Sequence, residues 1–449
     1  MNGNLSPSNI STKQSKIASL VSTDSERALT TLAHHIDYEW LYEAYRRTRK
    51  NAAPGVDGVS AEQYAENLEE NLSSLLDRFK SGRYRAPAVR RVHIEKDGGK
   101  STRPLGIPTL EDKILQRAVT MVLEPIYEQD FLDCSYGFRA GRSAHDAVSD
   151  LWQGLMNFKG CWVLDLDIAK FFDNVDRAHL NEMLDQRVRD GVIRRVIGKW
   201  LKAGVMENGV VHRPDRGTPQ GGVISPLLAN LYLHEVLDVW FERDVKPRLQ
   251  NRAFMVRYAD DAVLCFKSEQ DARRVLAVLV KRLGRFGLSL NTSKTKLIRF
   301  APSTHLTSDD DDEGGSQRQS ASFDFLGFTH TWQRSRKGRW IVVRRTAKGR
   351  FARALRSIWL WCRRNRHRTL DEQQRLISLK LVGHYNYFGI PGNSRSLRCF
   401  LYRVTLVWCY WLRRRTSKKL SWDKLLRLVN RYPLAPARLP SRVKSGGQL

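Results

Sequence analysis

The most constraining feature of this sequence is a pair of adjacent acidic residues inside an otherwise apolar stretch. The tetrapeptide Tyr258-Ala259-Asp260-Asp261 lies in the middle of residues 254–266. Its flanks are β-branched, aromatic or aliphatic and contain no Gly or Pro, which predicts two short buried strands joined by a turn. Two neighbouring carboxylates at such a tip are costly to bury unless a cation binds them. A solvated Asp-Asp turn is the alternative interpretation.

A second apolar stretch, residues 160–164, runs directly into Asp165 and Asp167. These two aspartates share one face of a strand because side chains alternate along it. Asp167 with Asp260 and Asp261 would give three carboxylates, whose oxygens suit Mg²⁺. Two such ions on a nucleotide can stabilise both an attacking 3′-oxygen and a leaving pyrophosphate. The alternative role for Asp167 is N-capping of the helix predicted to follow.

The excess of positive charge indicates which class of partner the protein binds. The 449 residues contain 76 Lys and Arg against 47 Asp and Glu, a formal net charge of +29, while 41% are hydrophobic. A chain of this length is expected to form two or three domains. Its positive charge favours a large polyanion, meaning nucleic acid, as partner. No long uncharged apolar run is present to anchor a membrane. The six cysteines form no C-x-x-C pair and are typical of reduced thiols in an intracellular protein.

Two stretches that contain Gly- and Pro-rich turns are candidates for ligand contact. Residues 89–108 alternate around an Asp-Gly-Gly turn and predict a hairpin that carries Lys100 and Arg103 near its tip. These cations suit a triphosphate or a nucleic-acid backbone, although a solvated basic hairpin fits equally well. Residues 217–226 form a Gly/Pro-rich turn before a helix, where backbone N–H groups and the Gln220 amide could contact a base or sugar.

The ends of the chain differ in character. Residues 1–30 are predicted to form a flexible polar tail, and residues 301–322 an acidic flexible insertion. From Lys348 onward the sequence is helical and strongly basic, with interleaved aromatics that either stack on bases or fill a core. The arginines proposed to contact RNA phosphates, rather than form a solvated face, are Arg363, Arg364, Arg366, Arg368, Arg413, Arg414 and Arg415.

The order of these stretches resembles the reverse transcriptase/maturases encoded by group II introns. The resemblance implies an α/β (α+β) right-hand polymerase with fingers and palm, followed by an α-helical thumb or maturase domain. One departure is Glu95, which stands where the family usually has Pro. The matching blocks are residues 84–108, 135–143, 165–173, 217–226, 258–261, 287–296 and 323–328, and residues 383–395 resemble the maturase block.

The resemblance also implies roles for individual residues. The family's first metal carboxylate lies five residues before an aromatic beneath the incoming sugar, which selects Asp167 and Phe172. Phe172 would then exclude a 2′-hydroxyl. Asp167, Asp260 and Asp261 would be the catalytic metal ligands for two Mg²⁺, with Mn²⁺ able to substitute. The nucleotide-binding residues would be Lys100, Arg103, Phe172, Gln220, Gly221 and Lys294, with Lys294 a candidate proton donor to pyrophosphate.

The resemblance implies an RNA-directed DNA polymerase that binds its intron RNA, assists splicing and supports retrohoming by target-primed reverse transcription at a DNA target. Its other partners would be an RNA template, a DNA primer and dNTPs, with no membrane, in a bacterial cytoplasm. The alternatives are a splicing maturase without polymerase activity and a reverse transcriptase repurposed for phage defence. The expected domains are an N-terminal extension at 31–83, fingers and palm at 84–328 and a thumb at 345–449, without an endonuclease module.

Overall fold

The computed structural model describes residues 7–22, 27–95, 102–207, 209–212, 217, 221–302, 321–415 and 421–439. The chain forms two compact units. The first unit contains Met1–Ser143, Leu166–Leu264 and Ser268–Lys296, and the second contains Ala144–Asp165, Cys265–Lys267 and Leu297–Leu449.

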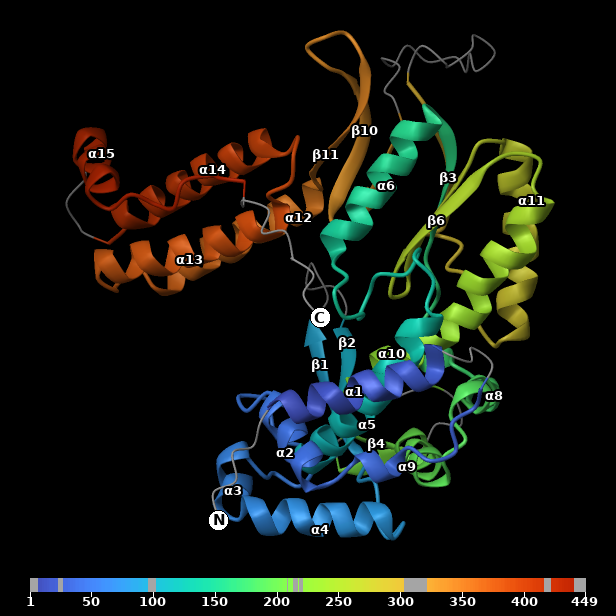
Figure 1. Cartoon of the computed structure of the whole chain (residues 1–449). Coiled ribbons are helices and arrows are strands. Elements are labelled where there is room, and N and C mark those ends of the chain that lie inside the picture. The colour runs from blue at the N-terminus through green and yellow to red at the C-terminus, as the bar shows by residue number, and fades with distance from the viewer. Residues whose placement is uncertain are drawn as a thin grey trace. The chain divides into compact units, whose positions relative to one another are not determined.

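The strands predicted around the acidic tetrapeptide are present. Strand β6 spans Ala253–Tyr258 and strand β7 spans Asp261–Phe266, so the chain turns at Ala259 and Asp260. They belong to a four-stranded sheet of order β6-β7-β3-β8, in which β3 is Cys161–Leu166 and β8 is Lys296–Phe300 (Figure 1). The apolar residues of β7 from Ala262 to Phe266 are all buried, which is what the uninterrupted apolar run predicts.

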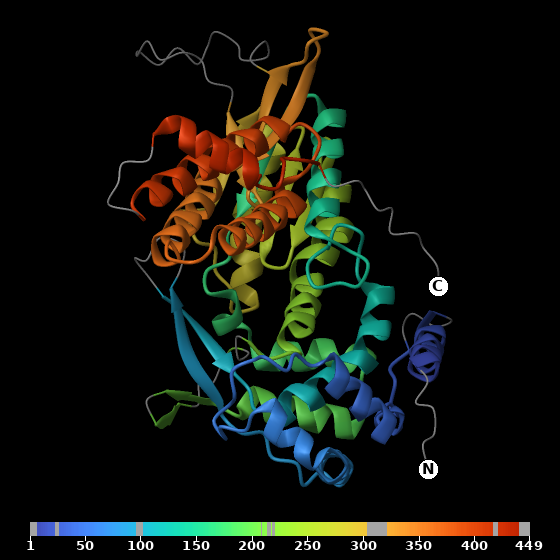
Figure 2. The same cartoon turned by 90° about the vertical axis from the view of Figure 1, so that its left-hand side faces the viewer.

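The predicted basic hairpin is also confirmed. Strands β1 (Val89–Glu95) and β2 (Thr102–Ile107) pair antiparallel, with Glu95 opposite Thr102 (Figure 2). Strand β4 (Val205–Glu207) joins β1 in parallel and pairs in turn with β5 (Val210–His212). The turn of the hairpin, including Lys100, lies outside the described residues.

The expectation of a loose tail over residues 1–30 is wrong for its central part. Residues Pro7–Ser22 form helix α1, which packs against helix α5 (Leu110–Asp130). Ile17 and Val21 are buried, and the Gln14 side chain donates from Nε2 to the Met121 carbonyl over 2.9 Å. The many Ser and Lys residues of this stretch obscured a helical apolar period that the fold uses.

Helix α5 is the buried centre of the first unit. Helix α2 (Tyr38–Arg47) also packs on it, and the buried Trp40 donates from Nε1 to the Ala118 carbonyl over 2.9 Å. The other α-helices described in this unit are α3 (Ala61–Glu66), α4 (Leu68–Lys80), α7 (Phe171–Asn174), α8 (Arg177–Arg187), α9 (Gly191–Lys202), α10 (Ser225–Leu233) and α11 (Glu269–Arg285).

Two predicted helices differ in detail from the sequence pattern. The single helix expected over residues 61–79 is divided at Asn67, whose φ of −124° and ψ of 46° are not helical. The helix expected over residues 225–241 is longer, because α10 continues as the π-helix η2 (His234–Val245), before the short 3₁₀ helix η3 (Lys246–Arg248). The break at Asn67 and the π-helical continuation of α10 leave the apolar periodicity almost unchanged, so the sequence pattern does not reveal them.

The second unit joins a β-meander to basic helices. Strands β9 (Ser322–Phe325), β10 (Phe328–Arg334) and β11 (Trp340–Thr346) pair in the order β11-β10-β9. Helix α6 (Ala144–Phe158) packs on β11, where the Trp152 Nε1 donates to the Val342 carbonyl over 2.7 Å.

Three long helices of this unit pack against one another: α12 (Lys348–Arg364), α13 (Leu370–Phe388) and α14 (Ser394–Arg413) (Figure 1). The chain then forms α15 (Trp422–Arg431). Of all the helices in the described part of the chain, none combines the length and apolarity needed to cross a membrane.

Asp112 near the start of α5 provides a test of this core. It is 1% exposed, its Oδ1 accepts from the Trp200 Nε1 over 3.2 Å, and burial raises its pKa to about 7. The folded state therefore holds this proton more tightly than the unfolded state, and stability falls as pH rises from about 4 to 7.

We expect Asp112→Asn to raise the free energy of unfolding at pH 8 by about 1–4 kcal/mol, with the gain shrinking toward pH 4. The amide keeps the acceptor for Trp200 and removes the buried charge. Urea unfolding at pH 8 and pH 5 measures this, with Asp77→Asn on the exposed face of α4 as control. Equal pH dependence in wild type and Asp112→Asn would show that Asp112 is not the group responsible.

Candidate active site

The acidic turn between β6 and β7 has an unusual backbone. Ala259 has φ +56°, a left-handed conformation that residues other than Gly rarely adopt. Asp260 is half-buried and Asp261 is exposed. The turn therefore presents two adjacent carboxylates at the end of a buried hairpin, as the sequence predicts.

Asp167 lies one residue beyond the end of β3, the strand next to β7 in the sheet. Its Oδ2 accepts from the Lys294 Nζ over 2.9 Å, with side chains 32% and 65% exposed. Its carbonyl accepts from the Asn291 N–H over 2.8 Å. An ion pair this exposed adds little stability, so its main effect is to orient the Asp167 carboxylate. Two residues that the sequence assigned to the site are thus in direct contact.

A cavity of about 520 Å³ collects three of the predicted nucleotide-binding residues. Arg103 comes from β2, Phe172 from α7, and Gly221 from the turn before α10. The volume lies within the range typical of small-molecule sites. The other lining residues are Ile94, Glu95, Leu105, Phe138, Gly222, Ser225 and Pro226.

Phe138 is a member of this cavity that sequence reasoning did not assign. Its side chain is 58% exposed and its φ is +58°. The signal available in the sequence was an aromatic residue within a loop rich in Gly and Arg. Of the other predicted nucleotide contacts, Lys100 and Gln220 lie outside the described residues, and Lys294 is not among the residues that line the cavity.

Position 221 accepts only glycine, because the backbone of Gly106 leaves no room for a side chain. Its φ is +115°, and a Cβ there would lie 2.2 Å from the Gly106 carbonyl oxygen of β2. The N-terminus of the following helix is fixed by Gln116, whose Oε1 accepts from the Val223 N–H over 2.7 Å. Gln116 is buried in α5. No sequence pattern distinguishes it from other polar residues of that helix.

Gly217 lies against the backbone of the segment that carries Phe172. Its φ is +87°, and a Cβ would lie 2.9 Å from the Phe172 carbonyl oxygen and 2.8 Å from that of Asp173. The Phe171 ring is buried. Its centroid lies 5.3 Å from that of the Phe172 ring and 6.4 Å from that of the Tyr232 ring. Close backbone approach on one side and aromatic packing on the other therefore set the position of Phe172.

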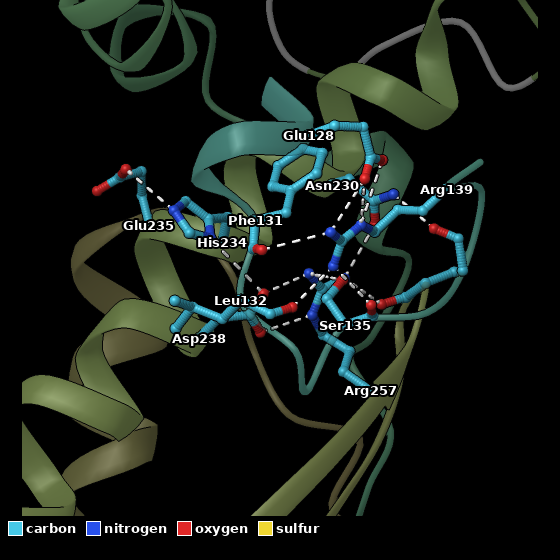
Figure 3. Close-up of polar contacts among 12 residues, drawn as sticks. Glu128, Phe131, Leu132, Ser135, Arg139, Asn230, His234, Glu235, Asp238 and Arg257 are labelled. Carbon is cyan, nitrogen blue, oxygen red and sulfur yellow. Dashed lines mark hydrogen bonds and ion pairs between the residues drawn. The ribbon is translucent and has the colours of Figure 1, made fainter. Parts of the chain in front are cut away.

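A buried polar network is bonded to the backbone of the acidic turn, where the Arg257 side chain donates to the Ala259 carbonyl. Figure 3 shows the side chains of this network. Arg257 and Asp238 are each 0% exposed and form a bidentate pair, with Nε–Oδ1 at 2.7 Å and Nη2–Oδ2 at 2.5 Å. Burial by itself lowers the pKa of Arg257, but the Asp238 carboxylate more than compensates and the net shift is upward. The only signal in sequence was a charged residue within an apolar strand.

A second buried arginine stabilises the adjacent loop. Arg139 binds the Glu128 carboxylate through Nε and Nη2, at 3.1 and 3.0 Å, and donates from Nη1 to the carbonyls of Leu132 and Ser135 (Figure 3). Close by, burial lowers the pKa of His234 to about 4, so this ring is neutral at physiological pH. The loop that supplies Phe138 is therefore fixed from within the protein.

The three predicted metal ligands supply only carboxylate oxygens, the donors that Mg²⁺ prefers. All three side chains are at least partly open to solvent, and one already has a cationic neighbour in Lys294. These residues fit a divalent cation in chemistry. Among the described residues, however, no group of three or more His, Cys, Asp or Glu is gathered closely enough to hold one.

The predicted RNA-contacting arginines belong to the second unit and are mostly at its surface. Arg368 is half-buried and binds Asn365 and Glu372. Arg414 stacks on Tyr410 at 4.8 Å. The exposed members are Arg363, Arg364, Arg366, Arg413, Arg414 and Arg415.

The molecule also has a larger hollow of about 770 Å³ between η2 and α11, lined by Trp240, Val278 and several cations. None of the predicted site residues within the described part of the chain lines it. The smaller cavity is therefore the better candidate site, because chemistry rather than size distinguishes the two.

Comparison with known proteins supplies independent information. The family model for reverse transcriptase (RNA-dependent DNA polymerase) matches residues 94–330. Protein YkfC of Escherichia coli (strain K12) is 36% identical over 328 residues, which is 64% of this chain and 84% of that protein.

Two relatives are proteins of introns. The group II intron-encoded protein LtrA of Lactococcus lactis subsp. cremoris is 39% identical over 270 residues, covering 58% of this chain and 45% of that protein. A 91 kDa protein in the cob intron of Schizosaccharomyces pombe is 35% identical over 308 residues, covering 57% and 37%. The chain thus spans less than half the length of these two relatives.

The contact between Gly137 and the acidic turn can be tested directly. A Cβ on Gly137 would lie 2.4 Å from the Ala259 nitrogen and 3.0 Å from the Tyr258 carbonyl carbon, both backbone atoms. We expect Gly137→Ala to lower the free energy of unfolding by roughly 1–3 kcal/mol, because the turn must move to accept it. Urea unfolding of the full chain measures this.

Gly284→Ala is the matched control, since Gly284 lies in α11 with no atom within 4 Å of the added Cβ. It should be neutral or stabilising by up to about 1 kcal/mol, as Ala favours helix. Equal effects of the two substitutions would show that the turn does not depend on the glycine.

Proposed function

Because the chain belongs to the reverse transcriptase (RNA-dependent DNA polymerase) family, we propose that it extends a DNA primer along an RNA template by using dNTPs. The cavity that brings Arg103, Phe172 and Gly221 together is the observation that supports a nucleotide site. The family match covers all three residues. Asp167, Asp260 and Asp261 are the proposed catalytic metal ligands.

Each lining residue has a distinct task in this proposal. Arg103 donates to the triphosphate, which neutralises charge and fixes its orientation. Phe172 lies beneath the sugar, where its ring leaves no room for a 2′-hydroxyl. Gly221 permits close approach of the nucleotide to the backbone, as it already permits that of β2.

The carboxylates and Lys294 act on the reacting groups. Mg²⁺ held by Asp167, Asp260 and Asp261 would lower the pKa of the primer 3′-hydroxyl and neutralise the triphosphate. Lys294, which now donates to Asp167, is within reach of that side of the site and can give a proton to departing pyrophosphate. In-line attack breaks the α–β phosphoanhydride bond as the 3′-oxygen bonds to the α-phosphorus.

The second proposed activity is binding of intron RNA to assist splicing. Its support is the similarity to intron-encoded proteins and the exposed arginines around α12 and α14. Arginine suits phosphate because its planar donors match two oxygens at once. Retrohoming would use the same polymerase, primed at a nicked DNA target. In this proposal residues 84–328 form fingers and palm, and residues 345–449 a thumb.

The first test is primer extension on an RNA template with dNTPs and Mg²⁺. We expect Asp260→Asn to lower the extension rate by at least about 10²-fold, because it removes charge that stabilises the transition state. Glu269→Gln, on the exposed start of α11, is the control and should extend like wild type. A folded, RNA-binding wild type that fails to extend primers would refute the polymerase and favour a splicing cofactor alone.

The role of Phe172 can be tested by sugar selection. Phe172→Ala should raise the incorporation of rNTPs relative to dNTPs by about 10-fold or more, since removing a steric block of this size restores room for the 2′-hydroxyl. The measurement is the ratio of the two specificity constants in single-nucleotide addition. An unchanged ratio, with wild-type dNTP addition, would show that discrimination lies elsewhere.

A further inference from the structure

The buried Arg257 side chain contacts the acidic turn itself. Its Nη1 donates to the Ala259 carbonyl over 2.9 Å, two residues along the chain and directly before Asp260. Its other bonds go to three different segments: Asp238 of η2, Asn230 of α10 at 3.0 Å, and the Ser135 hydroxyl at 2.7 Å (Figure 3). The five N–H donors of a guanidinium are thereby used.

Asn230 links Arg257 to Gly137, the two residues that contact the turn. Its Oδ1 accepts from Arg257, and its Nδ2 donates to the Gly137 carbonyl over 2.6 Å. Gly137 in turn lies against the Ala259 backbone. The turn is therefore held on one side by Arg257 and on the other by Gly137, and Asn230 ties the two together.

The backbone reinforces the same arrangement. The Arg257 N–H donates to the Cys134 carbonyl over 2.7 Å, and the Tyr136 N–H donates to the Arg257 carbonyl over 2.9 Å. The left-handed conformation of Ala259 persists only if its surroundings over-determine it. Arg257 supplies one such restraint from inside the protein, the bond to the Ala259 carbonyl.

Stability alone does not explain a charged pair at this position. An ion pair with both partners fully buried is weak evidence for stability, because desolvation offsets most of the attraction. A buried guanidinium with fixed partners does, however, specify geometry in several directions at once. The pair lies directly beneath the two residues whose placement matters most for catalysis.

We propose that Arg257, held by Asp238, is a positioning residue that sets the geometry of Asp260 and Asp261 in the polymerase reaction. This inference rests on the proposed function of those carboxylates. Arg257 acts through the Ala259 carbonyl and contacts neither nucleotide nor primer. Its loss therefore slows the chemical step and leaves binding of template, primer and dNTP unchanged.

The test uses Arg257→Lys in the full chain. Lysine keeps the charge opposite Asp238 but cannot bond Asp238, Asn230, Ser135 and Ala259 together. We expect the single-turnover rate of nucleotide addition to fall by about 10- to 100-fold, the scale of a small misplacement of catalytic groups. The affinities for template–primer and for dNTP should stay within about twofold.

A second readout does not depend on activity. Hydrogen exchange of a peptide that spans residues 255–265 should be faster in Arg257→Lys, because the turn loses an internal tie. If wild type shows no extension, the proposed function fails, yet this exchange measurement still tests the positioning role.

Arg187→Lys is the matched control. Arg187 is also a buried arginine, and it binds the Asp130 carboxylate at 2.9 Å and the Arg27 carbonyl at 3.1 Å. It should lower stability without changing the rate of nucleotide addition. Asn230→Ala, which leaves the Arg257–Asp238 pair in place, should slow addition in the same direction as Arg257→Lys. The inference is overturned if Arg257→Lys and Asn230→Ala both add nucleotides at a rate within twofold of wild type. It is also overturned if hydrogen exchange of residues 255–265 is unchanged in Arg257→Lys.

Discussion

The bidentate pair between Arg257 and Asp238 is the interaction on which the site's architecture depends. It lies where β6, α10, η2 and the loop at Ser135 meet, and all of these elements belong to the first unit. Two surface carboxylates can be presented rigidly only if the backbone beneath them cannot relax. A buried guanidinium meets that requirement because its donors point in fixed directions within one plane.

Much of the fold could be predicted from the sequence, and the reason is periodicity. The hairpin around residues 258–261 and the hairpin at residues 89–107 follow from apolar alternation between turn signals. The family resemblance, argued from the order of motifs, is confirmed by the reverse transcriptase match over residues 94–330 together with the similarity to intron-encoded proteins. Helix α1 was missed because polar residues outnumber its buried ones, although Ile10, Ile17 and Val21 keep helical spacing.

The parts that could not be predicted depend on contacts between distant segments. Gln116 is 107 residues from the Val223 N–H that it caps. Asp238 of η2 is likewise 19 residues from Arg257, which it binds. In the same way, the composition of the cavity could be proposed from resemblance, but Phe138 entered only once the loop conformation was known. Sequence patterns report burial and local conformation, whereas these residues act through tertiary geometry.

The π-helical winding of η2 has a consequence for how this protein can change in length. Asp238, which binds Arg257, lies in this π-helix, which is wound more widely than an α-helix. Loss of one residue between Asn230 and Asp238 would rotate every later side chain by roughly a quarter of a turn around the axis. The carboxylate would leave Arg257 while the apolar composition stayed almost the same. Insertions and deletions should therefore be tolerated far less in this helix than substitutions at its surface, which makes its length, rather than its sequence, the character to compare among relatives.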